Sequence, residues 1–408
     1  MRHATLVALA ASLLTLIGCD RDSGSAPSVS PPDQTKVTLQ LNWKPEPQFG
    51  GFYAAKINGT FAEHGLDVDI REGGAGAPTV DMLAAGTVPF AVVSGDEIVV
   101  ARSLGKPVVA LFAVYQTHPQ GIMCRASRGF TKLEDIFKNE GTLAIEQGLG
   151  YAQFLKQRYG FDKLKIVPSP AGDLSFIRDD ERYAMQCFVT SEPLAAKKAG
   201  LEVTTFLVAD EGYNPYATVL ATNEQYLKAN RATVEKMVEA VREGWRAYLD
   251  DPSRTNETMY RLNPTMDEDT FIAAAEAQRP LIETPETKVR GLGTMSKQRW
   301  AELTNQLASL GIVKQAPAPE SCFVEVATVA PDAPATNPTS APAADWTHTL
   351  SRDEAYYQTG PQQGRPPEGT FKSGTKVKLL ENAGSYSRVT AENGTTAWVA
   401  SDALTPVR

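Results

Sequence analysis

The alternation of short apolar strands with helix-like stretches between Lys36 and Val208 most constrains how this chain folds. Strands are expected at 37–41, 66–70, 90–93, 108–112, 142–145, 164–167, 185–189 and 201–208, and helices at 52–61, 79–85, 98–104 and 151–159. A longer helix is expected from about Asn223 to Asp250, with an apolar face that includes Trp245. This order predicts an α/β fold of parallel sheets with helices on both faces.

The N-terminus has the features of an export signal. Arg2 and His3 precede an apolar run from Leu6 to Ile17, which is too short to span a bilayer. The run ends in Leu-Ile-Gly-Cys19 and resembles the bacterial lipobox, whose cysteine takes a diacylglycerol. We therefore expect a lipoprotein signal peptide at 1–18, lipidation of Cys19 and a flexible tether at 19–35. An ordinary secretory signal with an incidental cysteine is the alternative.

The charge and the cysteines exclude several classes of function. The net charge of −8 argues against nucleic acid as a partner. Cys124, Cys187 and Cys322 are too widely spaced for a metal motif, and they are expected as buried thiols. No cofactor or metal is expected.

Several segments resemble one family of solute-binding proteins. Leu41–Pro47, Gly51–Ala55 and Phe61–Val68 resemble the opening of the NMT1/THI5-like proteins, and Ala101–Val108 and Gly244–Arg246 resemble later parts of them. The resemblance covers about residues 36–323. It implies a type II periplasmic-binding-protein fold with two α/β lobes, two crossovers and a ligand in the cleft between the lobes.

The same resemblance implies where the lobes lie along the chain. The solute-binding domain is expected at 36–325, with lobe one at 36–117 and 219–313 and lobe two at 121–215.

The resemblance also implies a role in transport. Proteins of this family serve ABC importers of thiamine pyrimidine precursors, aliphatic sulfonates, nitrate and taurine. We therefore expect an extracytoplasmic, membrane-anchored protein that binds such a small molecule and hands it to an ABC permease. The pyrimidine branch carries Asn and His before a shared glycine, where this chain has Pro47-Gln-Phe-Gly50. Sulfonates and other small nitrogenous compounds therefore remain open as ligands.

The expected ligand residues follow strand ends or lie at the crossovers, because ligands of open α/β sheets bind beyond the carboxyl ends of the strands. Trp43 is expected to stack on a flat heterocycle, and Glu146 and Glu192 favour a ligand with amino or amidine donors. Ser94 with nearby helix amides suits an anion. A core role for Trp43 and helix-end capping roles for Asp96 and Glu192 are the alternatives. The full set is Asn42, Trp43, Ser94, Asp96, Tyr115, Gln116, Glu146, Tyr151, Glu192 and Tyr216.

The alternative to a solute-binding protein is an enzyme. Fungal relatives make the thiamine pyrimidine with a histidine, a lysine and a cysteine-rich iron site. This chain has four histidines, no cysteine cluster and no Ser-His-Asp spacing, so we expect no enzymatic activity. His118 lies near a crossover and is expected as a hydrogen-bonding hinge residue.

The C-terminal part reads as a separate module. A Pro/Ala linker is expected at 326–344 and a small β domain at 345–408, with strands at 375–380, 386–390 and 396–399. Gly384-Ser385 and Glu392-Asn-Gly394 supply the expected turns. The spacing of Gly374, Val377, Tyr386 and Trp398 resembles a bacterial SH3-like barrel. Such a module implies a cell-wall peptide or protein partner, and a structural appendage is the alternative.

Overall fold

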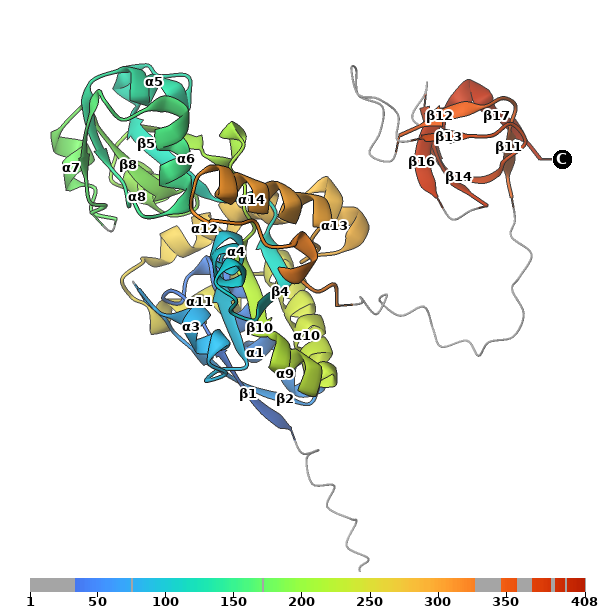
Figure 1. Cartoon of the computed structure of the whole chain (residues 1–408), viewed down its shortest axis with the longest axis horizontal. Coiled ribbons are helices and arrows are strands. Elements are labelled where there is room, and N and C mark those ends of the chain that lie inside the picture. The colour runs from blue at the N-terminus through green and yellow to red at the C-terminus, as the bar shows by residue number, and fades with distance from the viewer. Residues whose placement is uncertain are drawn as a thin grey trace, which may run out of the picture.

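The computed structural model describes residues 34–74, 76–170, 172–326, 346–357, 369–382, 386–392 and 395–407. The expected signal, Cys19, most of the tether and the linker lie outside these residues. Within 34–326 the strands form two separate five-stranded sheets (Figure 1). We call the sheet β2-β1-β3-β10-β4 with its helices lobe one, and the sheet β7-β6-β8-β5-β9 with its helices lobe two.

Lobe one is built from both ends of this region. Its strands are β1 Thr35–Gln40, β2 Leu66–Arg71, β3 Phe90–Val93, β4 Val108–Tyr115 and β10 Ala217–Asn223. Its helices are α1 Gly50–Ile57, α2 Thr60–Glu63, α3 Thr79–Ala84, α4 Gly95–Ser103, α9 Glu224–Ala229, α10 Arg231–Asp250, α11 Ser253–Leu262, α12 Glu268–Ile282, α13 Pro285–Arg290 and α14 Lys297–Ser309, with 3-10 turns η1 Pro47–Phe49 and η4 Pro319–Ser321.

Lobe two is one continuous stretch of chain. Its strands are β5 Gln120–Arg125, β6 Gly141–Ala144, β7 Leu164–Val167, β8 Tyr183–Phe188 and β9 Val203–Leu207. Its helices are α5 Leu133–Lys138, α6 Gly150–Tyr159, α7 Ser175–Asp179 and α8 Glu192–Lys198, with 3-10 turns η2 Ala126–Arg128 and η3 Ala209–Glu211. The chain enters from β4 through 116–119 and returns to β10 through 208–216.

The prediction of wholly parallel sheets is wrong for one strand in each lobe. β1, β2 and β3 are parallel, but β10 is antiparallel to β3 and β4. In lobe two β6, β7 and β8 are parallel, but β5 is antiparallel to β8 and β9. β5 and β10 each follow a crossover, so they start at the edge where the other strands end. They must therefore run in the opposite direction.

Two helices expected as single elements are each divided. The helix expected over Phe52–Phe61 breaks at Asn58–Gly59, because Gly59 has a left-handed φ of 85°. The helix expected from Asn223 breaks at Asn230 into α9 and α10, and the Asn223 side chain caps α9 by accepting from the Tyr226 N–H at 2.7 Å.

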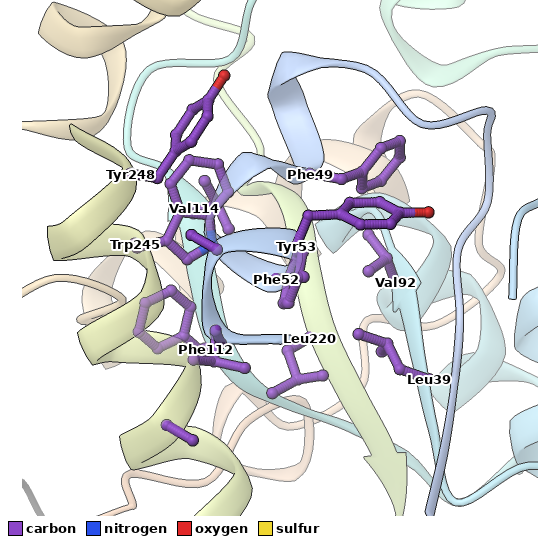
Figure 2. Packing of buried hydrophobic residues seen from close by; sticks show 14 of the residues in the cluster. Leu39, Phe49, Phe52, Tyr53, Val92, Phe112, Val114, Leu220, Trp245 and Tyr248 are labelled. Carbon is purple, nitrogen blue, oxygen red and sulfur yellow. The ribbon is translucent and has the colours of Figure 1, made fainter. Parts of the chain in front are cut away.

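Two apolar layers cover the sheet of lobe one. On one face α1 and α10 pack against strand residues such as Leu39, Val92 and Leu220 (Figure 2). Phe52 of α1 meets Trp245 of α10 edge to face, with ring centroids 6.0 Å apart. The α4 and α14 side chains cover the opposite face, and this second core continues without a break into lobe two. The lobes therefore share apolar contacts as well as two chain connections.

The C-terminal part has its own antiparallel sheet, in the order β16-β15-β14-β11-β17, and a separate pair β12-β13. The strands are β11 His348–Leu350, β12 Glu354–Tyr356, β13 Gly369–Phe371, β14 Lys376–Asn382, β15 Tyr386–Ala391, β16 Thr396–Ala400 and β17 Leu404–Pro406, with η5 Ser401–Ala403. Leu350, Phe371, Val377, Val389 and Val399 fill its core. The expected turn residues Gly384, Ser385, Asn393 and Gly394 lie outside the described residues.

Within the described ranges, no helix combines the length and the apolar character that crossing a membrane requires.

Candidate functional site

The segment after β1 places an aromatic ring beside a carboxyl group. Trp43 and Glu46 are both half-buried, and the Trp43 Nε1–H donates to Glu46 Oε1 at 3.0 Å. Pro45 and Pro47, on either side of Glu46, are buried and restrict the backbone. Asn42 is half-buried at the start of the same segment. The segment thus presents an indole and a carboxyl as one fixed unit.

Glu46 has an unusual protonation equilibrium. Burial raises the pKa of its carboxyl to about 7, although the Trp43 hydrogen bond opposes the rise. The charge of Glu192 in lobe two raises this pKa further. The two carboxyl groups therefore interact across the boundary between the lobes.

Tyr115, at the end of β4, supports the same segment from the sheet. It is fully buried, and its hydroxyl donates to Gln278 Oε1 at 2.7 Å. The Gln278 Nε2–H group in turn donates to the Pro47 carbonyl at 3.0 Å. Burial raises the pKa of Tyr115, Thr190 of lobe two opposes this rise through a hydrogen bond, and Glu46 adds to it. We call Trp43, Glu46, Tyr115, Thr190 and Glu192 the junction group, because they join both lobes.

Glu192 opens α8 at the lobe-two side of the junction. Its Oε2 accepts from the Phe188 N–H at 2.8 Å, and burial raises the pKa of its carboxyl. The backbone hydrogen bond agrees with the capping alternative, yet the carboxyl remains close enough to Glu46 and Tyr151 to affect their pKa values.

Tyr151 and Glu146 share a partner in lobe two. The buried Tyr151 hydroxyl donates to Gln186 Oε1 at 2.5 Å, and the Glu146 N–H donates to the same oxygen at 2.7 Å. Burial raises the pKa of Tyr151 well above its usual value, and Glu146, Cys187 and Glu192 add to the rise. The Glu146 side chain itself is exposed, so the structure puts it at the periphery.

Ser94 and Asp96 form the N-terminal cap of α4. The Ser94 hydroxyl donates to Asp96, and the N–H groups of Ser94 and Glu97 donate to carboxylates at 2.8 and 3.1 Å. Asp96 Oδ2 also accepts from the Tyr213 hydroxyl at 3.1 Å. A methyl group at Gly150 would lie 3.2 Å from that oxygen, so Asp96 abuts the first turn of α6 in lobe two. Carboxylates therefore already occupy the start of α4.

His118 lies in the first crossover between charged neighbours. Its Nδ1 accepts from the Gln120 N–H at 3.1 Å, which leaves the ring proton on Nε2. The His118 N–H donates to Asn214 Oδ1, in the second crossover, at 2.8 Å. Burial lowers the pKa of the imidazole to about 4, while Asp96 opposes and Arg299 strengthens the shift. His118 is thus a neutral residue that ties the two crossovers together.

Gln116 and Tyr216 make their hydrogen bonds to backbone groups outside the junction group. The Gln116 Nε2–H₂ group donates to the carbonyls of Ala113 and Thr294 at 3.1 and 3.0 Å, whereas its buried Oε1 has no donor within the described residues. The Tyr216 hydroxyl accepts from the Ser296 N–H at 3.0 Å, and the Arg299 guanidinium lies 3.9 Å from the ring centroid. Both side chains brace the crossovers.

An ion-pair cluster joins α8 of lobe two to the start of α12 in lobe one. Lys198 Nζ lies 2.5 Å from Asp267 Oδ1 and 2.8 Å from Asp269 Oδ2. Burial alone would raise the pKa of Asp267, but its hydrogen bonds to Lys198 and Thr270 lower it to about 2. This contact lies outside the expected residues, since two distant segments form it.

Two surface hollows lie away from the junction group. One of about 470 Å³ lies on lobe two between Lys132, Arg158 and Glu211, and one of about 480 Å³ lies between α6 and Leu310. Polar side chains line much of both hollows. A flat apolar ring therefore fits either hollow less well than it fits against the Trp43 indole.

The described cysteines and possible metal ligands add no reactive thiol or metal centre to the candidate site. Cys124, Cys187 and Cys322 are buried free thiols, and burial raises the pKa of each. Within the residues that the structure describes, no group of three or more His, Cys, Asp and Glu side chains is arranged to hold a metal ion.

Comparison with known proteins relates this geometry to a family. Residues 46–255 match the family described as NMT1/THI5 like. A formylaminopyrimidine-binding protein from Halalkalibacterium halodurans is 23% identical over 344 residues, which cover 80% of this chain and 99% of that protein. The riboflavin-binding protein RibY from Chloroflexus aurantiacus is 23% identical over 325 residues, covering 74% of this chain and 91% of that protein.

Two further similarities bear on fold and class. The 4-amino-5-hydroxymethyl-2-methylpyrimidine phosphate synthase THI11 from Saccharomyces cerevisiae is 21% identical over 57% of this chain and 73% of that protein. The periplasmic aliphatic sulphonate binding protein SsuA from Escherichia coli has a TM-score of 0.57 at 11% identity, covering 76% of this chain and 98% of that one. This likeness confirms the two-lobed periplasmic-binding-protein fold.

Proposed function

Because the chain belongs to the NMT1/THI5-like family, we propose that it is the extracytoplasmic solute-binding component of an ABC importer. It captures a small molecule between its lobes and delivers it to the permease. The proposed solute-binding domain is 36–325, with lobe one at 36–117 and 219–313 and lobe two at 121–215.

The junction group carries this proposal. It brings an indole, two carboxyl groups and two hydroxyl groups from both lobes to one place, and the charge of Glu192 reaches Glu46 across the boundary. A few polar groups beside an aromatic face are typical of small-molecule sites. A ligand that touches both lobes would also hold them together.

The chemistry of this group favours a nitrogen heterocycle with amino or amidine donors. Trp43 offers a face for stacking, and Glu46 and Glu192 offer acceptors. Relatives named for a formylaminopyrimidine and for riboflavin agree with this class. A sulfonate or nitrate ligand is the second candidate, supported by the fold of SsuA. The carboxylates of Asp96 and Glu97 at the start of α4 disfavour such an anion.

The N-terminal and C-terminal segments support a proposal for where in the cell the protein acts. We propose cleavage after Gly18, lipidation of Cys19 and a tether at 19–35 that holds the protein at the outer side of a bacterial membrane. The linker at 326–344 then carries an SH3-like domain at 345–408, which binds a cell-wall peptide or a protein. Its antiparallel sheet and separate core agree with that assignment.

Thermal-shift screening of residues 36–408 tests the ligand class. The panel is aminopyrimidines, riboflavin, taurine and nitrate, because a ligand present at 100 times its Kd stabilises the folded state by about 2.7 kcal/mol. Binding of taurine or nitrate and of no heterocycle would refute the proposed class.

Calorimetry with the strongest ligand then tests the site. Trp43→Ala and Glu192→Gln should each weaken binding roughly tenfold or more, since stacking and charged hydrogen bonds each contribute about 1 kcal/mol or more. Glu63→Gln, at an exposed acid on α2, is the matched control. Unchanged affinity in both site variants would place the ligand elsewhere.

The alternative function is that of an enzyme, a pyrimidine synthase. The similarity to the yeast synthase is the reason to test it. In our proposal the bound pyrimidine is recovered unchanged after incubation. Formation of a new pyrimidine by the purified protein, detected by mass spectrometry, would support the enzyme instead.

A further inference from the structure

Glu46 is held more firmly than a loop carboxylate usually is. Its carboxyl accepts from the Trp43 indole at 3.0 Å, and its carbonyl accepts from the Phe49 N–H at 2.8 Å. The buried Pro45 and Pro47 fix the chain on both sides. The Asn263 Nδ2–H group donates to the Pro45 carbonyl at 3.1 Å and lowers the pKa of the Glu46 carboxyl. The carboxyl therefore stays at the boundary between the lobes.

The charged and titratable neighbours of Glu46 leave negative charge in excess. The charge of Glu192 in lobe two raises the pKa of Glu46, and the Tyr115 hydroxyl lies close enough for Glu46 to raise its pKa. Among the described groups that change the pKa of Glu46, Lys44 is the one cation. Its side chain is exposed, and it lies two residues before Glu46 in the sequence. The charges that act on Glu46 are thus an acid in the other lobe and one solvated cation, and a nearby like charge opposes ionisation of its carboxyl.

Building on the proposed function, we propose that Glu46 selects the charge of the ligand, because its carboxyl is held beside the Trp43 indole between two buried prolines. A ligand with an ammonium group or a protonated ring nitrogen donates its N–H to the Glu46 carboxylate. The proton that the carboxyl held in the free protein passes to the solvent. A neutral ligand of the same shape can still donate an O–H to the carboxylate, but it brings no positive charge to pair with it.

Two probes of nearly equal shape test this selection. One is 4-amino-5-aminomethyl-2-methylpyrimidine, whose side-chain amine is protonated, and the other is its neutral 5-hydroxymethyl counterpart. The protein should bind the ammonium probe roughly tenfold more tightly, because only the ammonium group adds an opposite charge beside the carboxylate. The pyrimidine ring is common to both, so the ratio of the two Kd values isolates the side-chain group.

The ratio should also depend on pH. Since the pKa of Glu46 is about 7, its ionised fraction rises from about one-tenth at pH 6 to about nine-tenths at pH 8. The preference for the ammonium probe should therefore grow roughly tenfold over this range. Calorimetry in two buffers with different ionisation enthalpies should show a proton released as the ammonium probe binds.

Glu46→Gln, with Glu63→Gln as the control, decides the role of this residue. The Gln variant should lose the preference and the proton release, so that its Kd values for the two probes become nearly equal. A preference that survives in the variant overturns the proposal. Equal loss of both probes also overturns it, because Glu46 would then act only by positioning Trp43. If the wild-type protein binds neither probe, the proposed ligand class, a nitrogen heterocycle, is refuted, and the proposal for Glu46 is refuted with it.

Discussion

The contact between α1 and α10 allows a sharp test of the core of lobe one. Gly50 and Gly51 lie on α1, and Gly244 lies on α10. A methyl group at Gly244 would lie 2.2 Å from the Gly51 carbonyl oxygen and 2.6 Å from Ala55 Cβ. Both are fixed parts of α1, so no side-chain rotation relieves the clash. Gly244→Ala must therefore push the helices apart.

Two opposing effects set the size of the change. Overpacking a core costs about 1–3 kcal/mol or more, while alanine in place of glycine favours a helix by about 1 kcal/mol. Separation of the helices also weakens the contact of Trp245 with Phe52 of α1, whose ring centroid lies 6.0 Å away. We expect a net loss of about 1–3 kcal/mol, which lowers Tm by roughly 2–10 °C.

Thermal unfolding followed by circular dichroism measures this loss. Gly148→Ala is the control, because Gly148 is exposed, has no left-handed φ, and would carry a methyl group with no neighbouring atom within 4 Å among the described residues. The control should change Tm by a degree or so at most. A Gly244→Ala protein as stable as the wild type would refute the argument that the glycines set the distance between the helices.

Three other outcomes follow from the structure. Without ligand, the raised pKa of Glu46 should lower stability by up to about 3 kcal/mol as pH rises from about 4.5 to 7, because the folded state then binds more protons at Glu46 than the unfolded state does. Urea denaturation of the wild type and Glu46→Gln at pH 5 and 8 checks this, and the variant should show a smaller loss than the wild type, since the raised pKa values of Glu97 and Glu192 still contribute. Lys198→Ala should hardly change Tm but should speed ligand dissociation in stopped-flow measurements, since its partners Asp267 and Asp269 lie on the other lobe. Residues 345–408 should fold alone, and their removal should leave the Kd of the main domain within a few-fold.

The fold was predictable where local pattern determines structure. The short strands at 90–93 and 164–167 have the expected bounds, because continuous apolar runs between turn residues define them. The helix breaks at Gly59 and Asn230 were not predicted, since either residue is also tolerated within a helical pattern. The direction of β5 and β10 was also not predictable, because periodicity along one strand carries no information about its neighbours.

The candidate site was predictable only in part. Trp43 follows β1 and Tyr115 is the last residue of β4, and the pKa of Tyr115 responds to Thr190 of lobe two. The rule that ligand residues follow strand ends or lie at the crossovers also predicted Gln116 and Tyr216 as ligand residues. Their side chains instead hydrogen-bond backbone groups of Thr294 and Ser296, which lie far away in the sequence. Glu46 was missed because it follows the strand by several residues. An acid between two prolines beside a tryptophan was the signal that could have identified it.

The contacts between the lobes suggest which of them open for ligand exchange. The Lys198 ion pairs join side chains that are each about half exposed or more, with exposures of 47%, 49% and 80%. Such pairs are weak and readily remade. At the crossovers, by contrast, His118 and Arg299 hold Asn214 through part-buried hydrogen bonds, and the His118 ring stays neutral near pH 7. We therefore expect opening to break the contact of α8 with α12, while the crossovers stay joined and act as the hinge.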